Sequence, residues 1–386
     1  MNRREVLKAS LAAAVGAAGA GMNRSVSFAE TVNTVPSSAP AAQTPAVTTD
    51  TFEPNGRWTI EKANAWYAKQ PWPLGCNYVP TYAVNQLEMW QKSTFNPKII
   101  DEELALMAKT GMNTVRVFVH DLLWKEEKTD FYANINTFFD LCEKHAIRVG
   151  FNFFTNGGKE PSVRGPQPLS PPKVHNGEWR QTPGKERVMH KPENWGWMED
   201  YIMETMEYFR NDPRILFWDL FNEPYNSGDR HHTLGFLRLL WTWARRIETP
   251  IPLTSAIQGM HLTPIAVFLA ENSDILSFHC YSNAKTMEKL VTLLSGFRRP
   301  LICKEWLARG TRNCTVFDIL PIFKKYRVGA LNWGLIPGKL QTQYPWGWDE
   351  TKGEPEVWFH DLYHEDHTPY DPKEIELFRK LSERKD

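Results

Sequence analysis

Two glutamates end apolar runs of the sequence, where a parallel sheet would expose its functional groups. Glu223 follows the run ILFWDLFN and precedes a proline, and Glu305 ends the run PLICKE. Unpaired acids at the ends of buried strands would be costly in a purely structural role. A carboxyl pair can hydrolyse a glycosidic bond, because one group protonates the leaving oxygen while the other attacks the anomeric carbon. We therefore expect glycoside hydrolysis with carboxyl groups about 5 Å apart, as in retaining enzymes.

Polar and aromatic side chains on neighbouring strand-like runs have two possible interpretations. Arg116, within VRVF, could belong to the active site or pair with a core carboxylate, and the sequence favours neither. His279 and Tyr281 alternate along one run, so both would point inward beside Glu305, which favours a functional role. Trp333 could line the site or pack only in the core.

The elements that would hold these residues alternate between strand-like and helix-like segments. The strand-like runs are continuously apolar, as expected for strands buried on both faces. Eight strands are predicted: Leu74–Tyr78, Thr114–Val119, Arg148–Phe154, Ile215–Phe221, Pro252–Ile257, Ile275–Tyr281, Leu301–Glu305 and Gly329–Trp333. The pattern predicts an α/β fold, a single-domain (β/α)8 TIM barrel, with catalytic groups at the C-terminal ends of the strands.

Helical spacing and end signals mark the segments between the strands. Asn96 and Pro97 are a good cap and first residue of a helix that Gly111 can close. Further helices are predicted from apolar stripes, with a short one near the fifth strand and a last one near the C-terminus. These segments are 135–142, 202–209, 237–244, 263–272, 287–294, 316–323 and 372–383.

Two connections that follow predicted strands are much longer than the others. They cover residues 155–194 and 334–371, and the second contains Trp346, Trp348 and Trp358. Long excursions on one face of a barrel usually form binding walls. They favour a restricted cleft over an open groove.

The composition points to an uncharged partner. Lys plus Arg and Asp plus Glu both number 45, so no net field attracts nucleic acid or an anionic membrane surface. The 16 tryptophans are many, and although most should pack in the core, flat aromatic faces also suit sugar rings. An oligo- or polysaccharide substrate is therefore expected, and the oligomeric state is not predicted.

The N-terminal residues predict export. Arg3 and Arg4 precede an Ala/Gly-rich run, which resembles a bacterial twin-arginine signal, and residues 27–29 are a small-x-small cleavage candidate. The predicted organisation is a signal peptide over 1–29, a flexible Pro/Ala/Thr-rich tether over 30–54 and a catalytic domain over 55–386, without a carbohydrate-binding module. The run is too short for a bilayer anchor. The expected location is periplasmic or extracellular.

Neither the cysteines nor the histidines predict a cofactor or a metal. The five cysteines are odd in number and are not spaced as a disulfide framework, so all are expected to be reduced. Strand parity places Cys303 on the face of Glu305 and Cys280 on the opposite face, which argues against a bridge. The segment HDLYHEDH, residues 360–367, is a conceivable divalent-metal site, but it lacks a helical stripe.

Five short motifs together resemble glycoside hydrolase family 5, the cellulase and mannanase family. They are WDLFNEP, HCY at 279–281, ICKEW at 302–306, VRVF around Arg116 and NWG around Trp333. Asn-Glu-Pro alone is a weak signal, whereas the ordered set is specific. The resemblance spans roughly residues 72–340.

The resemblance implies a division of labour between the two acids. Glu223 would be the general acid and then the general base, and Glu305 would be the nucleophile. Arg116 and Tyr281 would orient and stabilise the Glu305 carboxylate. A neighbouring guanidinium keeps a nucleophile ionised, whereas less polar surroundings keep an acid protonated.

The resemblance also implies contacts with the substrate. Asn222 would hold the sugar 2-hydroxyl, and His279 would line the site near Glu223. Trp333 would form the platform under the attacked sugar.

One position departs from the family pattern. Family members usually have a histidine at the end of the third strand, where this sequence has FNFFTN with Asn152 and Asn156. His120, just beyond the second strand, could take over part of that role. The departure bears on sugar specificity and leaves the two-glutamate chemistry unchanged.

The sequence thus favours an exported retaining β-glycosidase of the cellulase, mannanase or β-mannosidase kind. The alternatives are a non-catalytic glycan-binding barrel and a transglycosylase that uses the same glutamate pair. A binding protein does not need two matched acids, which argues against the first alternative. The sugar, the linkage and endo versus exo action are not predicted.

Overall fold

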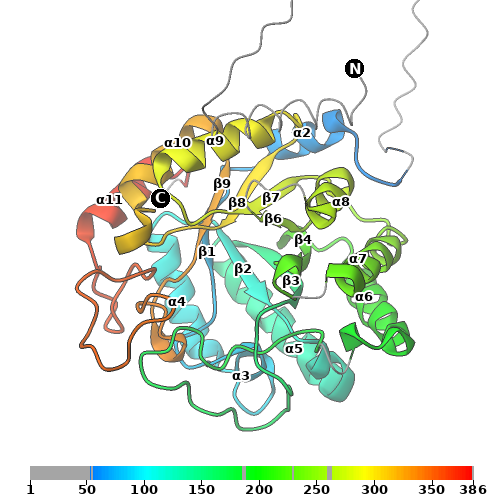
Figure 1. Cartoon of the computed structure of the whole chain (residues 1–386), viewed down its shortest axis with the longest axis horizontal. Coiled ribbons are helices and arrows are strands. Elements are labelled where there is room, and N and C mark those ends of the chain that lie inside the picture. Colours follow the sequence, from blue (N-terminus) through cyan, green and yellow to red (C-terminus); the bar gives the residue numbers. More distant parts are fainter. Residues whose placement is uncertain (1–52, 54, 185–187, 228–229, 259–262, 385–386) are drawn as a thin grey trace, which may run out of the picture. The chain divides into compact units, whose positions relative to one another are not determined.

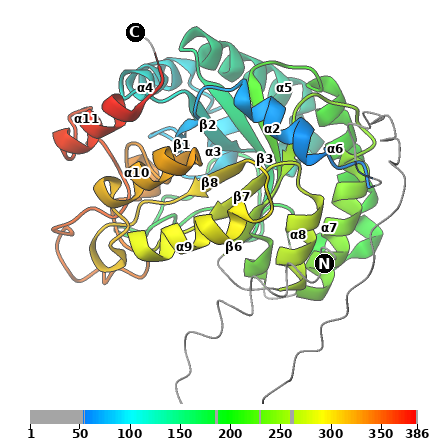
Figure 2. The same ribbon diagram turned by 90° about the horizontal axis from the view of Figure 1, so that it is seen from above.

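The structure is a computed structural model that describes residues 53, 55–184, 188–227, 230–258 and 263–384. The predicted signal peptide and almost all of the predicted tether therefore lie outside the described residues. In the described part, one parallel sheet curls into a barrel with helices around it (Figures 1 and 2). The predicted (β/α)8 fold is confirmed. None of the described helices is both long and apolar enough to cross a membrane.

The described residues contain nine strands in one sheet, ordered β5-β4-β3-β2-β1-β9-β8-β7-β6. Every strand pair is parallel, as expected when helices connect paired strands and return the chain to the starting edge. The strands are β1 Leu74–Asn77, β2 Thr114–Phe118, β3 Arg148–Thr155, β4 Ile215–Asn222, β5 Leu253–Thr254, β6 Ala256–Gln258, β7 Leu276–His279, β8 Leu301–Glu305 and β9 Gly329–Asn332.

The ninth strand arises because the predicted fifth strand is split at Ser255. β5 pairs only with β4, and β6 pairs only with β7. The two short strands together close the ring, so the barrel has eight positions as predicted. The Ser255 hydroxyl donates a hydrogen bond to the carbonyl oxygen of Phe221 at the break.

Ten α-helices are present in the described residues. Asn96 caps α4 through its side chain, and Pro97 is the first residue of that helix, as predicted. The helices α2 and α3 were not predicted. The bounds are α2 Ile60–Ala68, α3 Gln86–Trp90, α4 Pro97–Lys109, α5 Asp121–Lys144, α6 Gly196–Tyr208, α7 Arg230–Ala244, α8 Pro264–Asn272, α9 Ala284–Ser295, α10 Val316–Tyr326 and α11 Pro372–Leu381.

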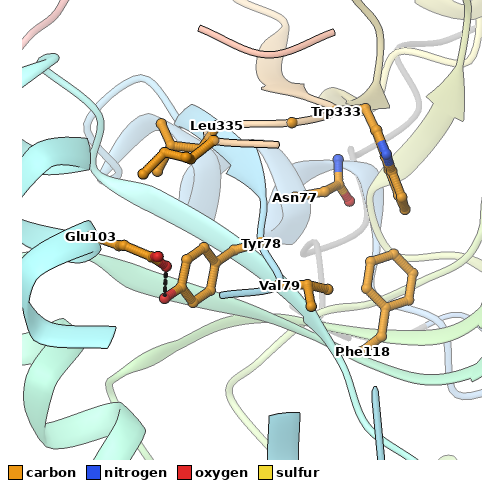
Figure 3. A pocket seen from close by; sticks show the side chains of 9 residues that line it. Asn77, Tyr78, Val79, Glu103, Phe118, Trp333 and Leu335 are labelled. Carbon is orange, nitrogen blue, oxygen red and sulfur yellow. Dashed lines mark hydrogen bonds between the residues drawn. The ribbon is translucent and has the colours of Figure 1, made fainter. Parts of the chain in front are cut away.

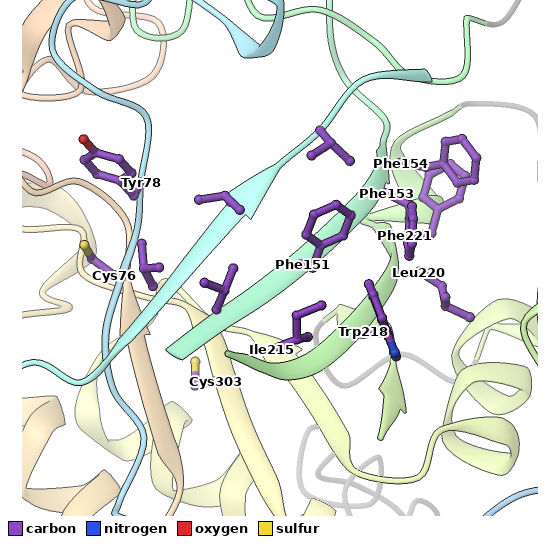
Figure 4. Close-up of a cluster of buried hydrophobic side chains, with 14 of the residues drawn as sticks. Cys76, Tyr78, Phe151, Phe153, Phe154, Ile215, Trp218, Leu220, Phe221 and Cys303 are labelled. Atoms are coloured by element: carbon purple, nitrogen blue, oxygen red, sulfur yellow. The ribbon is translucent and has the colours of Figure 1, made fainter. Parts of the chain in front are cut away.

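The strands bury side chains on both faces. Outward-facing residues such as Phe151 and Trp218 pack in the large core between sheet and helices (Figure 4). Inside the barrel, near the starts of the strands, a separate apolar cluster forms, against which Trp66 of α2 packs. Its members are Leu216, Phe217, Ile275, Ile302 and Leu331. We call this cluster the lower layer.

The lower layer is tightly filled. Gly150 leaves room for the ring of Phe217, because a Cβ at position 150 would lie 2.3 Å from that ring. Helix α2 covers this end of the barrel, since Asn64 and Tyr67 bond the carbonyl oxygens of Arg298 and Arg327, which precede β8 and β9. The opposite end, where the strands stop, is left for the site.

Candidate active site

Glu223 follows β4 directly and adopts an unusual backbone conformation. Its φ is +47°, in the left-handed region, which costs about 1–3 kcal/mol for a residue with a side chain. The chain then enters a short 3-10 helix, Pro224–Ser227. Asn226 in that turn donates a hydrogen bond to Glu223 Oε2 at 2.6 Å. The strained turn and the bond from Asn226 together fix the carboxyl group at the barrel mouth.

Glu305 reaches the mouth through a bulge at the end of β8. The register with β7 pairs Phe278 with Cys303 and then His279 with Glu305, which leaves Lys304 without a partner position. A bulge of this kind re-aims the side chains that follow it. Both Lys304 and Glu305 consequently contact groups inside the barrel, whereas Cys303 belongs to the outer core.

Two donors hold the Glu305 carboxylate. Arg116 on β2 donates to Oε1 at 3.0 Å, and the Tyr281 hydroxyl donates to Oε2 at 2.9 Å. Glu223 receives no bond from an Arg or Lys side chain within the described residues. The two acids therefore have different surroundings, and only Glu305 contacts a guanidinium.

His279 links the two acids. Its Nδ1 lies 2.8 Å from Glu223 Oε1 and 3.3 Å from Glu305 Oε2. One carboxylate oxygen of each glutamate and one ring nitrogen of His279 all lie within 4.8 Å of one another. Burial lowers the pKa of His279 to about 3, so the ring is neutral at ordinary pH. The contact with Glu223 then holds one proton between the ring and the carboxyl group.

Burial raises the pKa of both acids. For Glu305, the negative charge of Glu223 adds to this effect, while His279, Arg116 and the bond from Tyr281 oppose it. For Glu223, burial is opposed by the more distant Arg116 and by the bond from Asn226. The guanidinium contact from Arg116 favours the ionised form of Glu305, and Glu223 has no such contact within the described residues.

A layer of buried charges lies directly beneath the carboxyl pair. Arg116 donates from Nε to Asp219 Oδ2 at 2.7 Å, and Lys304 Nζ lies 2.5 Å from the same oxygen. All three side chains are fully buried. These three residues, together with Glu305, which Arg116 also contacts, are called the upper layer. The sequence left open whether Arg116 pairs with a core carboxylate or belongs to the active site. In the structure it does both, because it contacts Asp219 and Glu305.

Asp219, Lys304 and Asn226 were not predicted as site residues. A signal was present, because Asp219 and Lys304 interrupt apolar strand runs, where a charge buried on either face requires a partner. Asn222, which was identified, accepts a bond from Arg116 Nη2 at 2.5 Å and donates from Nδ2 to Thr155 Oγ1 at 3.3 Å. It therefore lies between the charged layer and the cleft.

A cleft of about 770 Å³ opens above these residues. Glu223, Glu305, Asn222, His279, Tyr281 and Trp333 all line it. Both long connections contribute walls, as predicted, and they bond to each other, for example from Asn176 N to the carbonyl oxygen of Leu340 at 2.9 Å. The volume fits a few sugar rings.

Aromatic side chains from both long connections line the cleft. Trp179, from the first long connection, packs edge-on against Trp333 with ring centres 5.9 Å apart. Trp346, from the second, packs edge-on against Tyr281 at 4.9 Å and is 45% exposed. Trp179 and Trp346 were not predicted as site residues, although their positions in long connections could have indicated them.

A small second cavity lies beside Trp333. Its volume is about 20 Å³, and Trp333 lines both this cavity and the cleft. Figure 3 shows Asn77, Phe118 and the hydrogen-bonded pair of Tyr78 and Glu103 around it. Trp333 therefore borders both the cleft and the second cavity.

Two expectations from the sequence need correction. His120 does not line the cleft, because its Nδ1 accepts the N–H of Leu122 at the start of α5 and its Nε2 contacts Ser162. The parity argument for Cys303 is also wrong, since the bulge at Lys304 separates the face of Cys303 from that of Glu305. All five cysteines are nevertheless free thiols.

The Asn pair at the third strand is divided between two levels. Asn156 lines the cleft, whereas Asn152 lies deeper and donates to the carbonyl oxygen of Asp219 at 3.4 Å.

Segment 360–367 does not gather its acids and histidines around one point. Among the described residues, the only group placed to hold a metal ion is Glu223, His279 and Glu305. His360 instead lines the cleft and bonds the carbonyl oxygen of Leu307 through Nδ1.

No protein-family model matches the sequence, and no curated protein matches it either. Solved structures are similar in fold. A GH5_18 protein variant from Streptomyces cattleya, in complex with Manb1-4GlcNAc, has a TM-score of 0.56 at 14% identity, over 81% of this chain and 80% of that chain.

Two further solved structures give similar values. An exo-beta-1,4-mannosidase from Opitutaceae bacterium strain TAV5 has a TM-score of 0.54 at 17% identity, over 81% of this chain and 60% of that one. An endo-beta-1,4-mannanase from Thermotoga petrophila has a TM-score of 0.54 at 11% identity, over 82% of this chain and 77% of that one. The chain therefore has the barrel fold of glycoside hydrolase family 5 structures and related glycosidases.

Proposed function

We propose that this protein is a retaining glycoside hydrolase that cleaves O-glycosidic bonds in β-linked glycans. The observation that carries the proposal is the grouping of Glu223, His279 and Glu305 atoms within 4.8 Å at the floor of the cleft. Retaining enzymes hold their carboxyl groups about 5 Å apart, whereas inverting enzymes need about 6.5–9.5 Å. The fold similarity to a mannosidase and a mannanase supports the glycosidase class.

In the first step, Glu305 attacks the anomeric carbon and the bond to the leaving oxygen breaks. Glu223 gives its proton to that oxygen, which leaves as a hydroxyl group. Arg116 and Tyr281 hold the Glu305 carboxylate in its attacking position. His279 supports the proton on Glu223 because its neutral ring contacts the carboxyl oxygen Oε1 of Glu223 through Nδ1.

In the second step, a water molecule attacks the glycosyl ester formed on Glu305. Glu223, now ionised, takes a proton from this water, and the bond from the sugar to Glu305 breaks. Loss of the glycosyl group returns Glu305 to the carboxylate and Glu223 to the acid. Two displacements at one carbon preserve its configuration.

The substrate is an uncharged β-linked oligo- or polysaccharide. Trp179, Trp333 and Trp346 line the same cleft as the two acids, and flat aromatic rings suit the C–H faces of sugars. Within this class, β-mannosides are our first candidates, supported by the solved structures named above, and β-glucosides are the second, from the sequence resemblance alone. Turnover of a panel of aryl glycosides and polysaccharides would identify the sugar.

The decisive test uses both glutamates and azide. Glu305→Ala should lose turnover of an aryl β-glycoside by at least about a thousandfold. Glu223→Ala should retain the first step on an activated aryl glycoside, and azide should then accelerate the reaction and give the β-glycosyl azide. Glu204, which forms an exposed ion pair with Lys128, provides the matched control, and Glu204→Gln should remain fully active. Normal activity in either alanine variant would disprove the assignment.

We also propose that the protein is exported through the twin-arginine pathway. The proposal is supported by Arg3, Arg4 and the Ala/Gly-rich run that follows them. Fractionation of bacterial cells should recover the wild-type protein outside the cytoplasm. The Arg3→Lys, Arg4→Lys variant should stay in the cytoplasm, and an unchanged distribution would contradict the proposal.

A further inference from the structure

Lys304 is a buried cation that the proposed mechanism does not use. Lys304 lies two residues after Ile302 on β8 and therefore shares its face, the barrel interior, where the Lys304 side chain has no solvent exposure. Its Nζ lies 2.5 Å from Asp219 Oδ2. A buried lysine is costly, and its desolvation must be offset by a nearby opposite charge. Asp219 supplies that charge.

Asp219 has a second cationic partner, Arg116, whose Nε and Nη2 both contact its Oδ2 at 2.7 Å. The same guanidinium donates from Nη1 to Glu305 at 3.0 Å. One Arg116 side chain therefore serves two carboxylates. Without another cation, Asp219 would neutralise the guanidinium and leave the Glu305 charge uncompensated in a buried site.

We propose that Lys304 is a positioning residue that neutralises Asp219 and thereby reserves the charge of Arg116 for Glu305. With Lys304 protonated, the upper layer holds two cations and two carboxylates and is neutral when Glu305 is ionised. When Lys304 is removed, the layer carries an excess negative charge, which Glu305 relieves by taking a proton. The inference rests on the proposed function, in which ionised Glu305 is the nucleophile.

The electrostatics of the site agree with this arrangement. Burial alone would raise the pKa of Asp219, but Lys304 and Arg116 outweigh it and hold that pKa below its usual value. Burial lowers the pKa of Lys304 to about 7, against the opposing effect of Asp219. The charged and titratable groups that act on Lys304 or feel its charge are Asp219, Arg116, Glu305, His279 and Glu223.

The proposal predicts a pattern of signs in three variants. Lys304→Met keeps the length of the side chain without its charge and should raise the pKa of Glu305. Asp219→Asn removes the competing anion and should lower that pKa. The double variant removes one charge of each sign and should return the pKa close to the wild-type value.

Two measurements read this pattern. The acid limb of kcat/KM for an aryl β-glycoside should move up by on the order of one pH unit in Lys304→Met, move down in Asp219→Asn and recover in the double variant. Carboxyl ¹³C NMR titration, assigned with Glu305→Gln, gives the Glu305 pKa without any activity. A purely structural lysine would lower activity in the single and double variants alike and leave the titration unchanged.

Each outcome has a clear meaning. If Lys304→Met does not fold, the opposite shift in Asp219→Asn and the recovery in the double variant still test the proposal. Unchanged Glu305 titration in the folded variants, or a double variant that resembles Lys304→Met, would overturn it. Full activity of Glu305→Ala would instead overturn the proposed function, and the NMR titration would still report the effect of Lys304.

Discussion

The inside of the barrel contains two layers with opposite chemistry. The lower layer consists of apolar side chains such as Phe217 and Ile302, and the upper layer consists of ions such as Asp219 and Lys304. On both β4 and β8 the two layers are only two residues apart. The same strands thus provide a dry floor and a charged support for the candidate site.

The two layers should differ in how well they tolerate substitution. The lower layer depends on volume, so a side chain of similar size and polarity can replace another at modest cost. The upper layer depends on the balance of charges, because removing one partner leaves a buried ion unpaired. The loss of a cation from the upper layer should therefore cost more stability than a small change of volume in the lower layer.

Loss of Arg116 should produce the largest effect. Arg116→Met would leave Asp219 and Glu305 with Lys304 as the only cation in the upper layer, which should cost about 3–5 kcal/mol of unfolding free energy at pH 7. Protonation of the carboxylates relieves the excess charge, so the cost should shrink as the pH falls toward 4. Urea unfolding at several pH values measures both effects. A cost independent of pH would show that Arg116 acts through packing alone.

Neutralising Glu305 should have a smaller effect of the opposite sign. The pKa of Glu305 in the fold is raised by burial, so its stabilising contribution is present below the unfolded pKa and is lost as the pH rises through the folded value. Glu305→Gln should therefore raise stability at pH 7 by about 0.5–2 kcal/mol, and the gain should vanish near pH 4. Thermal unfolding at both values provides the test. A destabilised variant at pH 7 would mean that the ion pair with Arg116 outweighs burial.

The lower layer should give the smallest change. Ile302→Val, two residues before Lys304, removes one methylene and should cost about 0.5–1.5 kcal/mol. Because no charge is involved, the cost should be equal at pH 4 and pH 7, and kcat/KM should keep its pH profile. A shifted acid limb in this variant would show that the two layers are mechanically coupled.

The fold could be predicted largely from the apolar runs of the strands, because strands buried on both faces leave a clear pattern. The split at Ser255 could not be predicted, since a break in pairing depends on the closure of the ring rather than on local sequence. Helix α2 was missed because its short apolar stripe is interrupted by polar residues. Its role at the lower end of the barrel becomes visible only when the strands are in place.

The site was predictable where residues lie at the ends of strands, as Glu305 at the end of β8 and Glu223 directly after β4 do. The support beneath them was missed, although Asp219 and Lys304 interrupt apolar runs, because the sequence does not show which partners face them across the barrel. The predicted common face of Cys303 and Glu305 was wrong because the bulge at Lys304 adds one residue, which reverses the alternation of faces. Contacts across the barrel, such as that of His279 with both acids, require the three-dimensional ring.

The break in the fifth strand determines where the barrel is easiest to open. Going around the ring, β5 and β6 stand between β4, which Glu223 directly follows, and β7, which ends at His279. Each short strand has a β-partner on one side only, so this joint has the fewest main-chain bonds to lose. Amide hydrogens of residues 253–258 should therefore exchange with solvent sooner than those of β8. The spacing of Glu223 and Glu305 across the barrel mouth therefore depends on the joint between β5 and β6, where no β-pairing holds the ring together.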